Sequence, residues 1–213
     1  MRGIVSSISS KDAVDFVMPR HYSGRKPQCS HSFGLYVDKK LVAVCIFGKP
    51  ASSTLCSGVC GKDNSKHVYE LNRLCRVDEY TGQLSGFVSA CLRRLRPYNL
   101  IIVSYADTGM SHCGYIYQAC NFIYTGCTKQ RLEFYVPNGG HSRHGDKGSH
   151  LRQIRTPKHR YIYFCTKDRR LKKKWVSLLK YEARPYPKTQ NKNYVLGSVI
   201  TPTVVDLTGQ HGK

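Results

Sequence analysis

The chain has 213 residues, of which 40% are hydrophobic, and this is enough to bury the core of one good-sized domain. Its 34 Lys and Arg side chains outnumber 13 Asp and Glu, so the net charge is +21. This excess favours a polyanionic partner, because cations that neutralise phosphates release counterions. The N-terminus lacks the apolar core of a signal peptide, and no apolar run approaches the roughly 18 residues of a membrane span. We therefore expect a cytoplasmic protein with a nucleic-acid partner and no membrane partner.

Four elements are predicted in the first third of the chain. In order, they are a helix at 11–20, a hairpin with strands at 33–37 and 41–47, a loop at 51–63 and a strand at 67–76. Ser9 or Ser10 is the expected cap of the helix, and Asp38-Lys39-Lys40 is the expected hairpin turn. The apolar residues of the last strand break strict alternation, which predicts a bulge or burial on both faces.

A second helix is predicted between Val77 and Pro97, where apolar residues recur at i, i+3, i+4 and i+7 and Thr81 is a candidate cap. The elements that follow are a strand at 100–105, a short helix at 114–120 and strands at 122–125 and 131–136, which continue the same sheet. The alternation of helices and strands favours an α/β fold, with a mixed central sheet flanked by helices.

Composition changes at Asn138, where a polar, Gly-rich stretch to about residue 160 predicts a long surface loop. A strand at 161–165 and a basic helix or turn with Trp175 on its apolar side follow. Between His141 and Gln190 there are fifteen Lys and Arg and three acids. We therefore interpret residues 1–137 as the core and 138–213 as a basic loop, final strand and C-terminal extension that complete the same domain. The candidate phosphate contacts are Arg152, Arg155, Lys158, Arg160, Arg169, Arg170, Lys172, Lys173 and Lys174.

Ten cysteines are spread along the chain, several of them inside apolar runs where they resemble small core residues. Cys56 and Cys60 form the one close pair, and no second pair with ligand spacing accompanies them. A structural zinc site is therefore not expected, and without an export signal disulfides are not expected either.

The segment 104–126 concentrates side chains that carry chemistry. Ser104 and Asp107 stand at the end of a buried strand, where reacting groups collect in open α/β sheets. His112, Tyr115 and Tyr117 follow, and together these groups could supply a nucleophile, a base and a phenolic acid. The alternative is that the tyrosines are core aromatics and Asp107 is a turn or cap residue.

Four blocks of the chain resemble the Mom DNA-modification proteins of Mu-like phages, whose core resembles GNAT acyltransferases. The blocks are HYSG (21–24), FGKPAS (47–52), ELNRL (70–74) and SYADTGMSHCGYIYQACNFIYTG (104–126). They occur in the family's order over about residues 10–136, with weaker likeness at 184–188. The fourth block is long and specific, whereas the first and third are short.

The resemblance implies a transferase that converts adenine in double-stranded DNA to an N6-acetamido (carbamoylmethyl-type) derivative, which shields phage DNA from host restriction in the bacterial cytoplasm. The catalytic candidates are His21, Tyr22, Glu70, Arg73, Ser104, Asp107, His112 and Tyr117. On these positions Asp107 or His21 would act as base, Tyr117 as proton donor and Arg73 as anchor of an anionic donor. The family also suggests an iron site, for which His21 and Asp107 are the candidates.

The donor of the transferred group is open. Ordinary GNAT enzymes hold the pyrophosphate of acetyl-CoA with an Arg/Gln-x-x-Gly-x-Gly/Ala loop at a helix N-terminus. Here Gly82 and Gly86 have a different spacing, and Asp78 and Glu79 add negative charge. Both acetyl-CoA and an aminoacyl-tRNA such as glycyl-tRNA are therefore candidate donors, and the latter makes tRNA a second candidate partner. The donor-binding candidates are Arg73, Arg76, Gly82, Gly86 and Tyr124.

Two other functions compete with this interpretation. A GNAT-type N-acetyltransferase acting on a protein or small-molecule amine is disfavoured by the net charge and by the altered phosphate loop. A non-enzymatic DNA-binding protein is disfavoured by the grouping of Asp107, His112 and Tyr117. An enzyme that modifies a base edge in a duplex must expose the base, and Tyr22, Tyr105 or Tyr115 could stack on it. The sequence also leaves a homodimer open.

Overall fold

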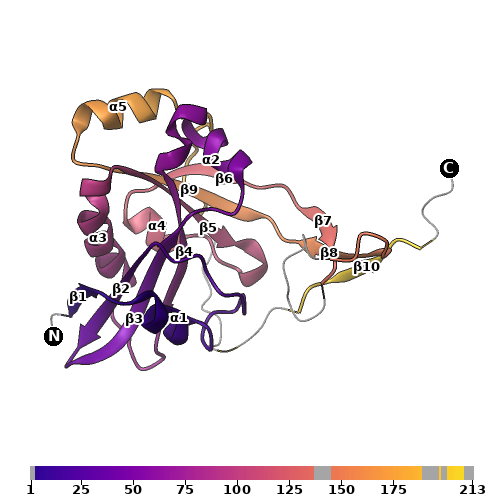
Figure 1. Ribbon diagram of the computed structural model, residues 1–213, viewed down its shortest axis with the longest axis horizontal. Helices are drawn as coiled ribbons and strands as arrows, with labels where there is room; N and C mark the ends of the chain where they lie inside the picture. The colour runs from indigo at the N-terminus through magenta and orange to yellow at the C-terminus, as the bar shows by residue number, and fades with distance from the viewer. Residues whose placement is uncertain (1–2, 137–144, 189–196, 198–200, 209–213) are drawn as a thin grey trace.

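The computed structural model describes residues 3–136, 145–188, 197 and 201–208. Its body is a seven-stranded mixed sheet in the order β1-β2-β3-β4-β5-β9-β6 (Figure 1). In chain order these strands are β1 Ile4–Ser7, β2 His31–Val37, β3 Lys40–Gly48, β4 Val68–Arg76, β5 Leu100–Asp107, β6 Ile123–Cys127 and β9 Lys158–Cys165. Neighbouring strands are antiparallel except β4 and β5, which run parallel. The predicted mixed α/β fold is confirmed.

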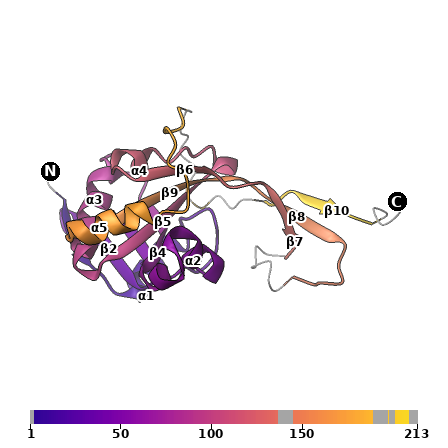
Figure 2. The same ribbon diagram turned by 90° about the horizontal axis from the view of Figure 1, so that it is seen from above.

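Helices cover both faces of this sheet (Figure 2). They are α1 Ser10–Val17, α2 Ser53–Cys60, α3 Leu84–Leu95, α4 Tyr115–Ala119 and α5 Arg169–Ser177, with 3-10 turns η1 Lys62–His67, η2 Arg96–Tyr98 and η3 Thr108–Met110. Because strand side chains alternate between faces, Cys45 and Phe47 pack under α3 while Val44 and Ile46 pack under α1. In the described part of the chain, none of these helices has the length and apolar character that crossing a bilayer requires.

Several sequence predictions are confirmed. The hydroxyl of Ser9 caps α1 by accepting a hydrogen bond from the amide of Asp12. The β2–β3 hairpin turns at Asp38 and Lys39, both of which have positive φ. The β3–β4 register shifts beside Ile46, which confirms the expected bulge. The predicted apolar stripe of α3 is buried, although that helix begins at Leu84 without a side-chain cap, so Thr81 does not cap it.

The predicted loop at 51–63 is wrong in its central part, because α2 occupies it. The Ser52 hydroxyl caps this helix by accepting from the amide of Leu55, and Val59 and Cys60 become buried beneath α5. The small residues of α2 give a weak apolar pattern. Its buried residues are covered by α5, a helix more than a hundred residues later in the chain. Strand β1 was not expected either.

A second sheet corrects two further predictions. Strand β7 (Arg131–Phe134) does not continue the main sheet but pairs with β8 (Leu151–Arg155), which in turn pairs with β10 (Val204–Asp206). We call this three-stranded sheet the arm. Strand β8 lies in the stretch that was expected to be a surface loop, whereas residues 138–144 and most of the tail beyond 188 fall outside the described residues. Strands β7 and β8 of the arm lie between β6 and β9 in the chain, whereas β10 follows α5. The arm projects from the body in both views (Figures 1 and 2).

The helix α5 is anchored by one side chain, Trp175, which is fully buried. Its ring packs against Phe164 and His67, and its indole N–H donates to the side-chain oxygen of Asn64 at 2.9 Å. We expect Trp175→Ala to lower the free energy of unfolding by about 3–5 kcal/mol, because it leaves a large cavity. Chemical denaturation measures the change, and Val176→Ala, at an exposed neighbouring position, should cost less than about 0.5 kcal/mol. Equal stability of the two variants would contradict this anchoring.

Candidate active site

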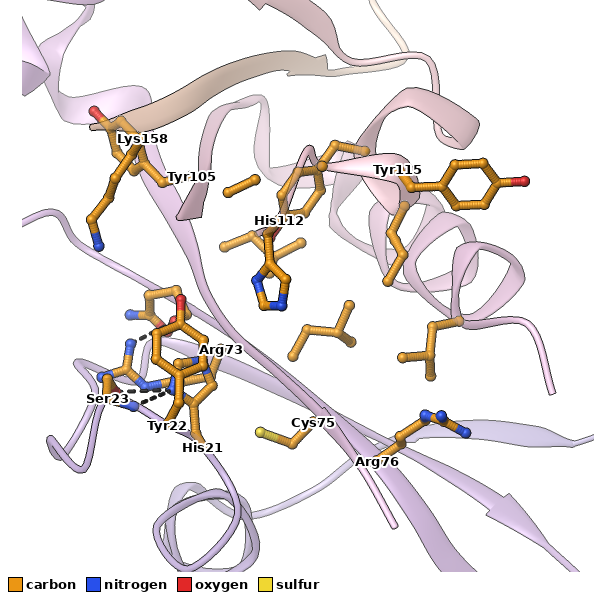
Figure 3. A pocket seen from close by; sticks show the side chains of 18 of the residues that line it. His21, Tyr22, Ser23, Arg73, Cys75, Arg76, Tyr105, His112, Tyr115 and Lys158 are labelled. Atoms are coloured by element: carbon orange, nitrogen blue, oxygen red, sulfur yellow. Dashed lines mark hydrogen bonds between the residues drawn. The ribbon is translucent and has the colours of Figure 1, made fainter. Parts of the chain in front are cut away.

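A cavity opens in the body where β4 and β5 separate. The two strands pair only from Val68↔Ile101 to Leu71↔Ser104, yet β4 continues to Arg76 and β5 to Asp107. The buried Ser104 hydroxyl donates to the carbonyl of Leu71 at 3.2 Å, at the point where pairing ends. Beyond this point the gap between the strands opens into a cavity of about 370 Å³ (Figure 3). This volume lies in the range of small-molecule sites.

Two groups of side chains line the cavity. On the sheet face covered by α1, α2 and α5, strand alternation places Glu70, Tyr105 and Lys158, and the loop after α1 adds His21 and Tyr22. On the opposite face α3 and α4 contribute Leu84, Ile116 and Tyr117. Six of the eight catalytic candidates line the cavity, namely His21, Tyr22, Glu70, Arg73, His112 and Tyr117. Ser104 and Asp107 lie just behind its wall.

His21 is held as a neutral imidazole. The backbone amide of Ser23 donates to its Nδ1 at 3.1 Å, so in the neutral ring Nε2 carries the proton. Burial, together with the positive charges of Arg73 and Lys158, lowers the pKa of His21 to about 3. Its ring stacks on Tyr22 with centroids 4.3 Å apart, and Tyr22 meets His112 edge-on at 5.8 Å. The loop therefore presents an aromatic wall with an N–H donor rather than a free base.

Glu70 is the carboxyl whose surroundings favour proton uptake. Burial raises its pKa, and the nearby positive charges of Arg73, Lys158 and Arg155 reduce this shift without reversing it. A carboxylate with a raised pKa is a stronger base, as a general base near neutral pH requires. Glu70 is thus better suited to accept a proton than Asp107, whose pKa is lowered.

Two buried polar atoms beside Glu70 have no hydrogen-bond partner among the described residues, Arg73 Nε and Asn72 Oδ1. The terminal nitrogens of Arg73 are already engaged, since they donate to the carbonyls of Asn72 at 2.6 Å and Arg25 at 2.8 Å. Both residues line the cavity. Because buried polar atoms are almost always paired in folded proteins, these two atoms indicate where a bound ligand would supply the missing donor and acceptor.

Both carboxylate oxygens of Asp107 are engaged by neighbouring groups. Its Oδ2 lies 2.7 Å from Lys158 Nζ, and its Oδ1 accepts from the Thr156 hydroxyl at 2.6 Å and the Gly109 amide at 3.0 Å. Burial alone would raise the pKa of Asp107, but these partners together lower it below its ordinary value. An ionised carboxylate with this many partners is a weak base, and its evident effect is to orient the Lys158 ammonium at the cavity wall.

Tyr117 presents a protonated phenol. Burial raises its pKa to about 12, although a hydrogen bond with Ser104 acts in the opposite direction. Its ring packs against Phe122 and Tyr161, with centroids 5.5 Å and 5.4 Å away, which fixes its orientation. The phenol is therefore available as a proton donor at neutral pH.

The donor-binding candidates divide by location. Arg73 and Arg76 line the cavity, and Arg76 donates to the carbonyl of Tyr80. Gly82 packs against the ring of Tyr80 and Gly86 lies in the first turn of α3, so neither lines the cavity. Tyr124 is buried under β9 with its hydroxyl 2.9 Å from His159 Nδ1, away from the cavity.

The nine candidate phosphate contacts also lie in different parts of the structure. Lys158 is a cavity residue, a location that the sequence did not indicate. Arg155 pairs with Glu133 at 2.7 Å and Arg152 stacks on Phe134, both in the arm. Arg160 of β9 stacks on Tyr181. The other five are exposed on α5: Arg169, Arg170, Lys172, Lys173 and Lys174.

His21 and Asp107 do not fit an iron site. The oxygens of Asp107 are engaged by Lys158, Thr156 and Gly109, and His21 Nδ1 accepts from Ser23. Within the described ranges, no three His, Cys, Asp or Glu side chains come together as metal ligands. Cys60 is buried with its thiol directed at the carbonyl of Trp175, which explains its place in the core.

A mixed sheet with two diverging parallel strands and helices on both faces defines the class of the protein, the GNAT acetyltransferase fold. The structure of yncA, a putative acetyltransferase from Salmonella typhimurium with its cofactor acetyl-CoA, is similar with a TM-score of 0.50. The match covers 79% of this chain and 96% of that chain at 8% sequence identity, which shows the fold alone.

The sequence comparisons are more specific. The model of the Mom protein family matches residues 2–188, and the chain therefore belongs to this family. Among curated proteins, the methylcarbamoylase Mom of Escherichia phage Mu is 25% identical over 203 residues, covering 86% of this chain and 83% of the relative. The expected fold and family are both confirmed.

The buried state of His21 predicts a pH-dependent stability. Its folded-state pKa of about 3 lies below the ordinary value of 6.5, so the unfolded chain binds the proton first as the pH falls. The free energy of unfolding should therefore decrease between about pH 6.5 and 3, by at most about 1.4 kcal/mol per pH unit from this group. His21→Gln should weaken this dependence in urea denaturation. Titration of the His21 ring between pH 5 and 7 in NMR spectra would contradict the neutral assignment.

Proposed function

We propose that this protein is a phage DNA-modification transferase that converts adenine in double-stranded DNA to an N6-acetamido (carbamoylmethyl-type) adenine in the host cytoplasm. Such a product would protect phage DNA from restriction. Membership of the Mom family, the methylcarbamoylase name of the Mu relative and the net charge of +21 support this proposal. The observation that carries it is the cavity between β4 and β5, which is lined both by Glu70, whose pKa is raised by burial, and by the protonated phenol of Tyr117.

The target base would enter this cavity from the duplex. The exocyclic amine of adenine takes part in base pairing, so the base must be flipped out before it can react. The rings of Tyr22, Tyr105 and His112 line the cavity and offer surfaces on which a purine can stack. Lys158, fixed by Asp107, supplies a positive charge at the same wall, where it can contact the phosphate of the flipped nucleotide.

Proton transfer follows from the two titratable groups. The lone pair of adenine N6 is conjugated into the ring, so N6 attacks a carbon of the donor only if its proton leaves. When the donor is a glycyl ester, N6 bonds to the ester carbonyl carbon as the carbon–oxygen bond of the ester breaks; Glu70 accepts the N6 proton, and Tyr117 donates its phenolic proton to the departing ribose oxygen. The immediate product is N6-glycyladenine, which has the same atoms as the carbamoylmethyl product and must rearrange to reach its connectivity. Ser104 holds Tyr117, and Asp107 holds Lys158, so both act by positioning.

The donor would approach from the side of α3 and α4. Arg76 and the residues at the start of α3 line this end of the cavity, and Asp78 adds a negative charge there. A pyrophosphate is disfavoured beside Asp78, whereas a glycyl ester of tRNA brings two carbons and one nitrogen, the content of an acetamido group. Adding acetyl-CoA or glycyl-tRNA to the purified protein with duplex DNA distinguishes these two donors.

We expect Glu70→Gln to lower the rate of DNA modification by at least roughly 100-fold, because removal of a general base typically costs that much. The readout is mass spectrometry of nucleosides from plasmid DNA co-expressed with the protein, in which deoxyadenosine gains the mass of an acetamido group. Glu182→Gln is the matched control, since it makes the same change at an exposed site outside the cavity.

The outcomes of this experiment are distinct. Unmodified DNA in the presence of intact wild-type protein contradicts the proposed function. Acetylation of a protein or small-molecule amine with unmodified DNA favours the ordinary GNAT alternative. Full activity of Glu70→Gln with modified DNA contradicts only the role of Glu70.

Tyr117→Phe should lower modification by roughly 100-fold or more while the protein stays folded, because the ring keeps its packing against Phe122 and Tyr161. Tyr98→Phe is the matched control, since Tyr98 lies outside the cavity with 60% of its surface exposed. Nucleoside mass spectrometry and thermal unfolding are measured together. Equal activity of both variants would exclude Tyr117 as the proton donor.

A further inference from the structure

We infer that α5 is a phosphate clamp that holds the DNA duplex about six base pairs from the active site. The inference rests on the proposed function, since it assigns the surface that binds the same substrate. Three observations carry it: the composition of α5, its unpaired charges and its position on the sheet face that bears the cavity.

The composition of α5 works against the stability of the helix. Its sequence is RRLKKKWVS, with five cations and no acid in nine residues. Like charges four residues apart, such as Arg169 with Lys173 and Arg170 with Lys174, repel each other on the helix surface. Arg169 and Arg170 also stand in the first turn, where the helix dipole disfavours cations. Folding alone therefore does not account for these charges.

The charges of α5 are also not neutralised by the protein. No ion pair joins any of its five cations to a carboxylate in the described part of the chain. The adjacent Asp168 is used as the N-cap, accepting from the amides of Arg170 and Leu171 at 2.8 Å and 3.0 Å. The η1 turn, whose Asn64 accepts from Trp175 of α5, carries exposed Lys62 and Lys66 and one exposed acid, Asp63.

The position of α5 connects this surface to the cavity. Trp175 packs on Phe164 of β9, and strand alternation places Phe164, Ile162, Arg160 and Lys158 on one face. Lys158 lines the cavity at the other end of this row. The two ends are six residues apart, which is roughly 20 Å along a strand.

This separation matches a duplex rather than a small ligand. At about 3.4 Å per base pair, 20 Å corresponds to about six base pairs, so α5 would meet backbone phosphates that flank the flipped base. A membrane surface fits less well, because the main apolar side chain of α5, Trp175, is buried in the protein and unavailable to lipid. We therefore assign duplex DNA as the partner of α5.

The test compares two double variants that remove the same charge. Lys172→Gln with Lys173→Gln alters α5, and Lys40→Gln with Arg93→Gln alters exposed sites at the β2–β3 turn and on α3. Binding of a labelled duplex of about 24 base pairs is measured without donor over a range of salt concentrations. We expect the α5 variant to bind at least about tenfold more weakly near 0.1 M salt, with a log–log salt slope shallower by about two. The control should bind within about twofold of wild type.

Duplex length provides the second readout. A duplex of about six base pairs, centred on the target adenine, extends only about 10 Å to either side at about 3.4 Å per base pair. It should not reach α5, and therefore the α5 variant and wild type should bind it equally. An equal loss on the short and long duplexes, or an equal loss in the control variant, would overturn the clamp.

A folded RNA with the same number of phosphates is tested in parallel. A larger effect of the α5 variant on this RNA than on the duplex would overturn the assignment of DNA as the partner. Binding and modification are separate measurements. If the α5 variant binds the duplex more weakly but wild-type protein leaves DNA unmodified, the clamp is supported and the proposed function is contradicted. If wild-type protein modifies DNA and the α5 variant binds the duplex as wild type does, the proposed function is supported and the clamp is contradicted.

Discussion

The early end of the hydrogen bonding between β4 and β5 is the constraint on which the site depends. Each strand diverges from the other without losing all its partners, because β4 stays paired with β3 as far as Arg76 and β5 stays paired with β9 as far as Asp107. Only the edges of β4 and β5 that face each other lose their backbone hydrogen bonds. Polar side chains or a ligand can form hydrogen bonds with the backbone groups at these edges instead. The outer strands therefore hold open a gap that an isolated pair of parallel strands would close.

The charges in this gap are mutually dependent. Lys158 and Asp107 come from β9 and β5, so their ion pair also joins the two strands at the cavity end of the sheet. Loss of one partner would leave the other buried and uncompensated, which is more costly than loss of both. The arm is attached at the same place, because Thr156, just after β8, donates to Asp107. A movement of the arm root would therefore reach Lys158 through one hydrogen bond and one ion pair.

The sequence predicted what local patterns determine. The stripe of α3 and the β2–β3 hairpin were readable because their burial follows from their own periodicity. The helix α2 and the arm were not, since small residues and mixed charged strands carry little pattern and their partners lie far along the chain. At the site, the family resemblance indicated Glu70 and Tyr117, whereas the cavity role of Lys158 required its pairing with Asp107, which no local motif reveals.

The cations of the chain fall into two groups, those paired with a carboxylate and those without such a partner in the described part of the chain. Lys158 at the cavity and Arg155 in the arm each pair with a carboxylate, Asp107 and Glu133, and a paired cation releases fewer counterions on meeting a phosphate than an unpaired one does. The cations of α5 have no such partner in the described part of the chain, so contact with phosphate can realise their full electrostatic effect. Substitutions on α5 can therefore change the affinity for a polyanion without altering the protonation of Glu70 or Tyr117. Substitutions in the cavity can likewise change the chemistry without altering the affinity for the duplex.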